Sequence, residues 1–446
     1  MNLDRGPLGR WTRRARELVR REELRALARR WREVILLAAS TGALTGVGVA
    51  LFDRAVVDGL YDRFVDLSPW LLAFLPLVGL GVAAACLGWL ARGASPSSAD
   101  AYLEAFHDRR HPIVLREVPG KMLAALGTLG FGGAMGLEGP SLYLGSSIGS
   151  FLQRRFPRIV GASDRRLLLV AGAAAGVAAI FKAPATGAVF ALEVPYQDDL
   201  ARRMLLPALV ASASSYLTFV AFNGTEPILP IHGNPAFSFA DLGGAVLLGL
   251  LAGVGARGFA LLVRQAKRIS AGGHTMVRVA AGGLTLAAVF ALGELLTSTS
   301  ITIGVGYDTI NWALAANRAV WLLLVILVLR CLATAATVAG GGVGGLFIPL
   351  VVAGALLGRA VGGMVGALDT SLFLVIGVAA FLGAGYRVPL AAVMFVAEST
   401  GRPGFVVPGL LAAVASELVM GRSSVTTYQT ASPERDERDD IRPPPS

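Results

Sequence analysis

Hydrophobic residues occur along this chain of 446 residues in long blocks separated by short polar stretches. Eleven blocks are long and apolar enough to enter a bilayer. They cover residues 34–52, 70–91, 121–137, 166–192, 203–222, 240–264, 278–297, 319–338, 345–366, 372–397 and 404–420. Blocks of this length predict helices, because a membrane barrel shows short strands of alternating hydrophobicity instead. The pattern therefore predicts an all-α polytopic membrane protein.

The composition excludes a soluble domain. Hydrophobic residues make up 54% and charged residues 16% of the chain, and the mean hydropathy is +0.63. Cys86 and Cys331 lie far apart in apolar blocks, so neither a disulfide framework nor a zinc site is expected. The four histidines show no HExxH spacing. We therefore expect no metal and no cofactor.

The net charge of +10 is concentrated at the N-terminus, where eleven arginines lie between Arg5 and Arg32. Apolar residues such as Leu18 and Leu27 alternate with them, which predicts an amphipathic helix over residues 1–33 on anionic lipid. The positive-inside bias places this end in the cytoplasm. A lipid bilayer, and not a nucleic acid, is the expected partner of these charges.

Glycine and proline interrupt many of the apolar blocks. The chain has 55 Gly and 22 Pro, and the clearest breaks are "GGAMGLEGP" at 132–140 and "AGGGVGGLFIP" at 339–349. Helices broken at membrane depth are tolerated where the freed backbone lines a cavity or binds a ligand. Close packing through small residues is the alternative explanation, and it fits "AGAAAGVAA" at 171–179.

The chain contains an internal repeat. "FKAPATGAVFALE" at 181–193 matches "YRVPLAAVMFVAE" at 386–398, 205 residues later. A second match, offset by 209 residues, pairs Pro140, Gly145 and Gly149 with Pro349, Gly354 and Gly358. Two matches in the same order indicate a duplication.

The duplication defines the expected organisation. It consists of the N-terminal helix (1–33), a first membrane repeat (34–222), a polar linker (223–239), a second membrane repeat (240–430) and a disordered cytoplasmic tail (431–446). Corresponding broken helices in two halves indicate a binding site near the middle of the membrane.

The broken helices favour an anion as the ligand. A helix N-terminus presents unpaired N–H groups and about half a positive charge. Pro140 and Pro349 suit a first helical turn, and the glycines before them allow the backbone to approach a ligand. Burying a bare ion costs on the order of 20 kcal/mol by a Born estimate, which several converging helix ends could offset.

Glu138 lies at one of these predicted helix starts. Its carboxylate could occupy the same N–H groups as the anion and close the pathway, and protonation would release it. An acid at membrane depth costs about 2.5 to 3.5 kcal/mol to insert, which indicates a function. The alternative is a helix-capping carboxylate without a transport role.

Together these motifs resemble those of the CLC chloride channels and proton/chloride antiporters. The resemblance rests on "GLEGP" for the family's GREGP, on "GLFIP", on "FKAP", on "GVGYDTI" at 304–310 and on the tyrosine of "GRSSVTTYQT". It implies an inverted-topology repeat of broken and tilted helices, of the bacterial type without CBS domains. It also implies a homodimer in the bacterial inner membrane that carries chloride or a similar small anion, with protons as a possible second substrate.

Carried over to this sequence, the resemblance makes Glu138 the external gating glutamate and Tyr428 the central hydroxyl donor. The amides expected around the anion belong to Gly136, Leu137, Gly139, Leu346, Phe347 and Ile348. The family's inner serine lies in a GSGIP motif, where this chain has "PSSAD" at 96–100. Ser97 then takes the serine position, with Ser98 as the fallback, and helix capping is the structural explanation.

Two departures from the family pattern change the expected electrostatics and proton transfer. Leu137 replaces the arginine of GREGP, and Lys182 is the nearest candidate in sequence to supply the lost charge. A lysine that snorkels from a helix end is the alternative. Val194 stands where the antiporters have their inner proton-transfer glutamate, directly after Glu193. Valine cannot carry a proton.

Several alternatives therefore stay open. The protein is a channel or a weakly coupled exchanger, unless Glu193 or the pair of Asp198 and Asp199 substitutes, or water delivers protons directly to Glu138. Loss of GSGIP leaves chloride, bicarbonate, nitrate and fluoride as candidate anions. A membrane-embedded enzyme that uses Glu138 as acid or base would need a partner group, and none lies near it in sequence, so we expect no enzyme.

Overall fold

The computed structural model describes residues 7–432, except 65–66, 109, 161–165, 230, 232–237, 316–317 and 367–369. The side chains of residues 7–30, 160 and 370 are also outside the described part. Residues 230 and 232–237 of the predicted linker, most of the predicted tail, and most side chains of the predicted N-terminal amphipathic helix therefore lie outside it.

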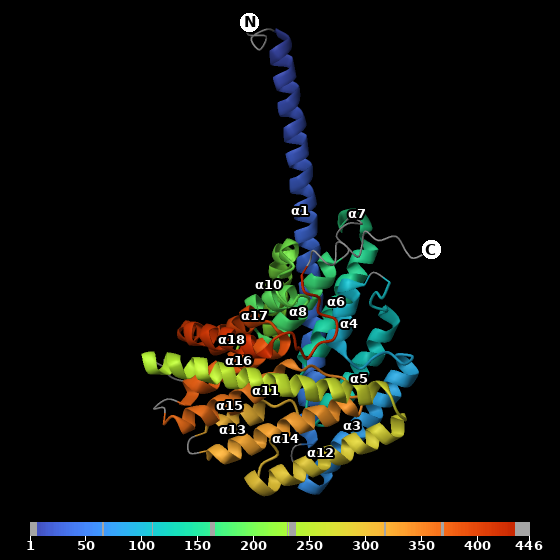
Figure 1. The fold of residues 1–446 in the computed structure, drawn as a ribbon. Helices are drawn as coiled ribbons and strands as arrows, with labels where there is room; N and C mark the ends of the chain where they lie inside the picture. Colours follow the sequence, from blue (N-terminus) through green and yellow to red (C-terminus); the bar gives the residue numbers. More distant parts are fainter. Residues whose placement is uncertain are drawn as a thin grey trace, which may run out of the picture.

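The described residues form helices and no strand, and Figure 1 shows how the helices are arranged. The first half contains α1 (Pro7–Val56), α2 (Asp62–Phe64), α3 (Pro69–Ala85), α4 (Ser98–His107), α5 (Val118–Gly130), α6 (Glu138–Arg155), α7 (Pro157–Val160), α8 (Leu167–Phe181), α9 (Pro184–Glu193) and α10 (Leu205–Asn223). The second half contains α11 (Phe239–Ala271), α12 (Thr275–Thr297), α13 (Tyr307–Leu314), α14 (Val320–Ala339), α15 (Phe347–Met364), α16 (Thr370–Tyr386), α17 (Pro389–Thr400) and α18 (Val406–Met420). Short π-helical segments, Val57–Tyr61 and Cys86–Leu90, extend α1 and α3, and single 3₁₀ turns cover Leu115–Glu117, Arg202–Met204 and Pro403–Phe405.

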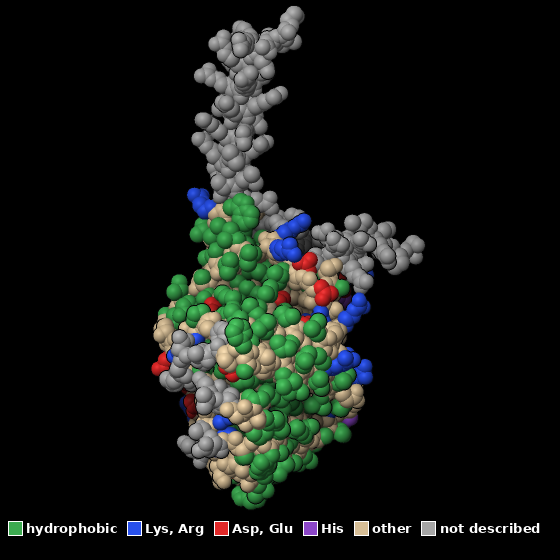
Figure 2. Space-filling model, turned by 60° about the vertical axis from the view of Figure 1, so that its left-hand side comes forward, with side chains coloured by type: hydrophobic (Ala, Val, Ile, Leu, Met, Phe, Trp, Pro, Cys, Tyr) green, Lys and Arg blue, Asp and Glu red, His purple; other side chains and the backbone are tan. Residues whose placement is uncertain are grey.

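The protein is an integral multi-pass membrane protein. Eight helices of the described chain are long and apolar enough to cross a bilayer. Figure 2 shows hydrophobic side chains over most of the face that it presents. Large apolar residues such as Trp70, Leu295 and Leu418 are exposed on the outside of the bundle, where a soluble protein would place polar groups.

Helix α1 is continuous from Pro7 to Val56 and projects beyond the other helices (Figure 1). The predicted boundary between residues 33 and 34 is therefore not a helix end. The predicted N-terminal helix and the first membrane span form one continuous helix.

Two of the predicted apolar blocks are each divided into two helices. Block 166–192 breaks between α8 and α9, and block 372–397 breaks between α16 and α17. Lys182 and Arg387 end the first helix of each pair in the left-handed conformation, with φ of 50° and 58°. The block 121–137 is helical only to Gly130, and the rest forms the non-helical approach to α6.

The two halves repeat the same packing, as expected for the CLC-type inverted repeat. Helix α6 packs on α8, and α15 packs on α16. Gly145 lies against the Gly172 carbonyl, and Gly354 lies against the Gly377 carbonyl. A Cβ at either position would collide with backbone, so only glycine permits this helix approach. The repeated glycines of the sequence therefore set the distance between the helices that carry the site.

Candidate functional site

Helices α6 and α15 begin side by side in the interior of the bundle. Gly136 and Gly345, just before the two helices, exchange backbone hydrogen bonds of 2.9 and 2.7 Å in an isolated antiparallel bridge. The two helix starts predicted from "GLEGP" and "GLFIP" are thus brought together. The Gly136 N–H is used in this bridge, so the structure does not leave it free for an anion as predicted.

The side chain of Glu138 crosses from α6 to the start of α15. Its Oε1 accepts a hydrogen bond of 2.6 Å from the Phe347 amide, and the Ile348 amide also faces the carboxylate. Glu138 is buried, and its Oε2 has no hydrogen-bond partner among the described residues. A negative group therefore occupies the positive end of α15, and half of its hydrogen-bonding capacity is unused.

The glycines around Glu138 have a steric role. A Cβ on Gly136 or Gly345 would collide with the Glu138 carboxylate, and a Cβ on Gly139 would collide with the backbone of Gly344 and Gly345. The carboxylate and the two backbones share a space that only glycine leaves open.

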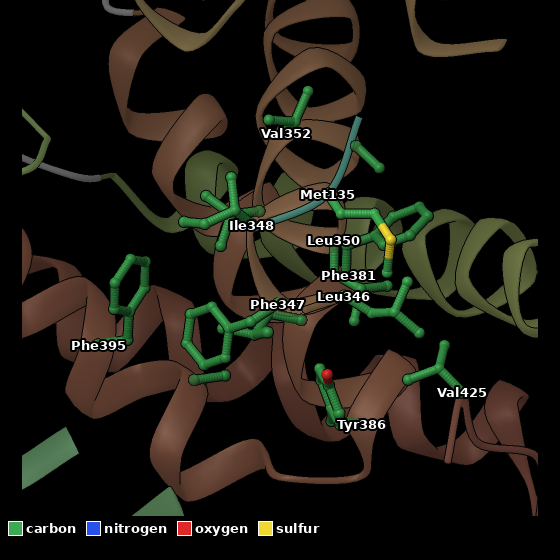
Figure 3. Close-up of a cluster of buried hydrophobic side chains, with 14 of the residues drawn as sticks. Met135, Leu346, Phe347, Ile348, Leu350, Val352, Phe381, Tyr386, Phe395 and Val425 are labelled. Atoms are coloured by element: carbon green, nitrogen blue, oxygen red, sulfur yellow. The ribbon is translucent and has the colours of Figure 1, made fainter. Parts of the chain in front are cut away.

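Aromatic rings surround the Phe347 end of the site (Figure 3). The Phe347 ring lies 4.3 Å from that of Phe181, 5.0 Å from Phe395 and 5.5 Å from Phe190, measured between centroids. All four rings are buried. They exclude water from the α15 amides, and this strengthens any electrostatic attraction that those amides exert.

Tyr386 supplies a buried hydroxyl at the same helix start. Its hydroxyl oxygen accepts a hydrogen bond from the Leu346 backbone amide, and Figure 3 shows the hydroxyl pointing from the end of α16 toward Leu346. The sequence did not predict that Tyr386 belongs to the site. The available signal was its position as the aromatic residue of "YRVP", one residue before a helix break.

Tyr428, the predicted hydroxyl donor, lies elsewhere. It is 42% exposed, and the backbone N–H before it, that of Thr427, donates to Asp100. The structure places Tyr386, and not Tyr428, at the Leu346 amide. Tyr428 was selected because it is the last tyrosine of the motif order, but its side chain is exposed, whereas the Tyr386 side chain is buried.

The two candidate serines lie at the start of α4. The Ser97 hydroxyl donates to Oδ2 of Asp100 at 2.9 Å, so it belongs to a second polar network. Ser98 is buried, and its hydroxyl has no hydrogen-bond partner in the described part of the chain. Neither serine hydrogen-bonds Glu138.

Lys182 binds the end of α10. Its Nζ donates to the carbonyl oxygens of Asn223 at 3.2 Å and Glu226 at 3.1 Å. None of these bonds goes to Glu138. These two carbonyl oxygens explain why a lysine lies at this helix end. Compensation by Lys182 for the missing GREGP arginine stays a prediction.

Glu193 caps a helix of the other repeat. Its Oε1 accepts from Leu390 N at 3.0 Å and its Oε2 from Ala391 N at 2.8 Å, at the start of α17. In return, the Glu398 carboxylate accepts from Ala185 N at 2.9 Å and Thr186 N at 2.6 Å, at the start of α9. The repeated glutamates thus cap each other's helices, and both oxygens of Glu193 are used.

The other candidates for proton transfer have local partners. Val194 is buried, and its carbonyl accepts from the Gln429 side chain. Asp198 pairs with Arg387 at 3.0 Å, and Asp199 pairs with Arg202 at 3.1 Å. Within the described residues, Asp198 and Asp199 do not contact Glu138.

The fold and the site together define a class: a multi-pass membrane protein with an internal repeat, whose broken helices direct their N-termini at one buried acid. The chain belongs to the voltage gated chloride channel family, whose family model matches residues 78–421.

Curated relatives cover nearly the whole chain. The chain is 29% identical over 427 residues to "H(+)/Cl(-) exchange transporter ClcA" of Cronobacter sakazakii, covering 92% of this chain and 91% of the relative. It is also 29% identical over 430 residues to ClcA of Salmonella paratyphi B, covering 90% and 89%.

Solved structures share the fold. A slow cyanobacterial Cl⁻/H⁺ antiporter superposes with a TM-score of 0.76 at 21% identity, covering 91% of this chain and 98% of that one. A CLC-type fluoride/proton antiporter superposes with a TM-score of 0.77 at 24% identity, covering 90% and 98%.

Proposed function

We propose that this protein transports chloride or a similar small monovalent anion across its membrane, through the site where α6 and α15 begin. The observation that carries the proposal is the Glu138 carboxylate on the Phe347 amide. A carboxylate carries the same charge as chloride, so amides that bind one can bind the other. The ClcA relatives are named as exchange transporters of protons and chloride, which makes chloride the first anion to test.

Glu138 acts as the gate because it competes with the anion for these amides. While the carboxylate occupies them, the pathway is closed. Protonation removes its charge and with it the attraction to the positive end of α15, so the side chain leaves and an anion enters. The same proton travels with the side chain, which makes Glu138 the proton carrier of any exchange reaction.

The remaining ligands of the anion come from both helix starts. On α15 they are the amides of Phe347 and Ile348, which the Glu138 carboxylate now occupies, and the Tyr386 hydroxyl beside the Leu346 amide is a further donor. On α6 the amides of Leu137 and Gly139 complete the set. Several weak donors hold a dehydrated ion tightly enough to enter and weakly enough to leave.

The first candidate mechanism is anion movement that is passive or only weakly coupled to protons. The position after Glu193 is Val194, and Glu193 itself caps α17 with both oxygens, so neither is suited to deliver protons. Strict proton exchange is the second candidate, and the naming of the ClcA relatives favours it.

The protein is proposed to be a homodimer in a bacterial inner membrane, with one pathway per subunit. The arginines of the first 32 residues place the N-terminus in the cytoplasm by the positive-inside rule.

The test is chloride flux from vesicles that contain the purified protein, measured between pH 4.5 and 7.5. Wild-type flux should rise as the pH falls, because more Glu138 is neutral, and Glu138→Gln should be fast at every pH. Glu226→Gln, which removes an exposed carboxylate, is the matched control and should behave as wild type. An unchanged flux and pH profile in Glu138→Gln would contradict the proposal.

A further inference from the structure

Glu417 is an acid of α18 that the proposed transport mechanism does not use. Its side chain is 20% exposed, and its Oε2 lies 3.6 Å from Nη1 of Arg387, which directly follows α16. Its Oε1 is buried and has no hydrogen-bond partner among the described residues. One oxygen of the carboxylate is therefore free to bind a proton or a water molecule.

Solvent reaches the arginine of this pair. Nη2 of Arg387 also bonds Oδ1 of Asp198 at 3.0 Å, and the Asp198 side chain is 68% exposed. Within the described part of the chain, the charged groups that act on Glu417 are this arginine, Asp198 in the loop after α9, and Glu193 of α9. Exposure falls from Asp198 to Glu417, so Glu417 is the first partly buried acid that a proton entering here would meet.

Arg387 and Gln429 connect the surroundings of Glu417 to the candidate site. Tyr386, whose hydroxyl lies at the Leu346 amide, directly precedes Arg387. The Gln429 side-chain amide donates to the carbonyl oxygens of Tyr386 and Val194, both at 2.8 Å. Val194 cannot carry a proton, but it lies beside groups that can bind water.

Buried polar atoms without a partner gather around this connection. Those found among the described residues are Nε of Arg387, Oε1 of Glu417, Oε1 of Gln429 and Oγ1 of Thr430. Thr430 belongs to the same cluster, because its carbonyl accepts from the Gln197 amide and the Gln197 carbonyl accepts from Arg387. Unpaired buried groups are costly, and water is their usual partner. The cluster therefore suits a chain of water molecules through which a proton can move.

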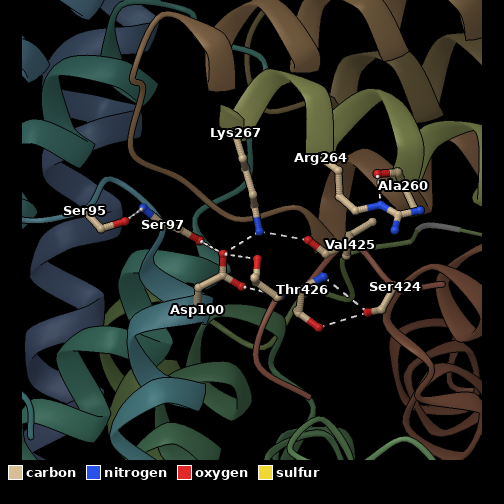
Figure 4. A network of polar contacts seen from close by, with 10 residues as sticks. Ser95, Ser97, Asp100, Ala260, Arg264, Lys267, Ser424, Val425 and Thr426 are labelled. Carbon is tan, nitrogen blue, oxygen red and sulfur yellow. Dashed lines mark hydrogen bonds and ion pairs between the residues drawn. The ribbon is translucent and has the colours of Figure 1, made fainter. Parts of the chain in front are cut away.

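Asp100 of α4 is a buried acid near Tyr386 that lacks this freedom. Its carboxylate bonds four donors, namely Lys267 Nζ at 2.5 Å, the Ser97 hydroxyl at 2.9 Å, the Thr427 amide at 3.0 Å and the Thr427 hydroxyl at 3.3 Å. Figure 4 shows Asp100 between the start of α4, Lys267 of α11 and the C-terminal segment. Lys267 also donates to the Val425 carbonyl at 2.9 Å, and the Val425 amide donates to Gly385 O at 3.0 Å. Both oxygens of Asp100 are used, so it ties these elements together and is not suited to take up a proton.

An ion pair that only ties α16 to α18 is the competing explanation for Glu417. Such a pair often adds little net stability, because desolvation offsets the attraction between the charges. The two explanations differ in proton movement. A structural tie acts on the stability of the fold, whereas a transfer group sets how many protons move for each anion.

We propose that Glu417 is a proton-transfer residue, which takes up a proton on the Asp198 side and passes it through water and the Tyr386 hydroxyl to Glu138. The Tyr386 oxygen accepts from the Leu346 amide, which leaves its own O–H free to donate. Tyr386 gives this proton to the Glu138 carboxylate and takes one from the water, so it stays neutral, and Glu417 returns to a carboxylate. The inference rests on the proposed function, because the delivered proton is the one that opens the Glu138 gate.

The test measures chloride and proton movement together, in vesicles that contain the purified full chain and a chloride gradient. In the native protein the gradient should drive protons in the opposite direction. Glu417→Gln should lower the number of protons moved per chloride by about tenfold or more, while chloride flux continues. Glu417→Asp keeps a carboxyl group and should retain part of the proton movement.

The matched control is Asp198→Asn, which breaks the other ion pair of Arg387 and leaves Glu417 in place. It should keep the native ratio of protons to chloride. Tyr386→Phe removes the hydroxyl that passes the proton, so it tests the same route if Glu417→Gln fails to fold. It should also lower the ratio.

An equal loss of proton movement in Asp198→Asn would overturn the inference, as would a native ratio of protons to chloride in folded Glu417→Gln or Tyr386→Phe. If Glu138→Gln changes chloride flux while the native protein moves no protons, Glu417 has no transfer role and the proposed function stands. If Glu138→Gln has no effect on the flux, the proposed function itself fails.

Discussion

The Phe347 amide donates a 2.6 Å hydrogen bond to Oε1 of Glu138, which lies 209 residues earlier in the chain. The bond joins the first repeat to the second at the two positions where a helix starts inside the membrane. A buried acid can hold a charge there because the positive end of α15 faces it. Transport depends on this one contact, because removal of the carboxylate frees the Phe347 amide to bind another anion.

The Tyr386 hydroxyl is expected to contribute to anion binding, and Tyr428 is not. Tyr386→Phe keeps the ring that packs 5.4 Å from Phe190 and removes only the hydroxyl at Leu346. Loss of one hydrogen bond should weaken chloride binding by about two- to tenfold. Calorimetric titration of the purified variants measures this, with Tyr428→Phe as the control. A larger loss of chloride affinity in Tyr428→Phe than in Tyr386→Phe would instead make Tyr428 the hydroxyl donor of the anion site.

Glu193 and Glu398 are expected to act on stability, because each caps a helix of the other repeat. Glu193→Gln and Glu398→Gln should each cost about 0.5 to 2 kcal/mol of stability, the usual value of a helix cap. Thermal unfolding in detergent should show similar decreases in Tm for both. If Glu193→Gln leaves Tm unchanged but alters the number of protons moved per chloride, Glu193 lies on the proton pathway after all.

The sequence predicted the elements of the site better than its side-chain contacts. The motifs around Pro140 and Pro349 predicted two helix starts at a common site, because a duplication places equivalent breaks at equivalent depths. The position of Glu138 between them followed from its unfavourable location in an apolar block. These inferences depend on local sequence and on the repeat.

Contacts between distant residues were not predictable in the same way. Tyr386 and Tyr428 are both tyrosines near helix breaks, and only the packing of α16 against α15 selects Tyr386. Glu193 resembles an intramembrane functional acid until its partners, the Leu390 and Ala391 amides, are known. Each of these partners is about 200 residues away, beyond any sequence pattern.

Gly345 is expected to hold space for the gate. A methyl group there would collide with the Glu138 carboxylate, so Gly345→Ala should displace the acid from the Phe347 amide. Chloride flux should then lose most of its dependence on pH. The control is Gly81→Ala in α3, where a Cβ would meet nothing within 4 Å. A normal pH profile in Gly345→Ala, with both variants folded, would show that the carboxylate does not need this position.

Lys267 is expected to raise the affinity of the pathway for anions on the Tyr386 side. Lys267→Met in the otherwise native chain should raise the chloride concentration for half-maximal flux, because it removes the ammonium beside Asp100. The flux measured at saturating chloride should change less. Vesicles with defined chloride on each side measure this, and an unchanged half-saturating concentration on both sides would contradict the expectation.

The most direct test of the central claim is the location of an anion in the site. Crystals of the Glu138→Gln variant grown in bromide, whose anomalous scattering identifies it, should contain bromide within hydrogen-bond distance of the Phe347 amide and the Tyr386 hydroxyl. At neutral pH the native protein should show the Glu138 carboxylate in that place. Absence of bromide from the Phe347 amide in these crystals, or α6 and α15 starting far apart, would contradict the account.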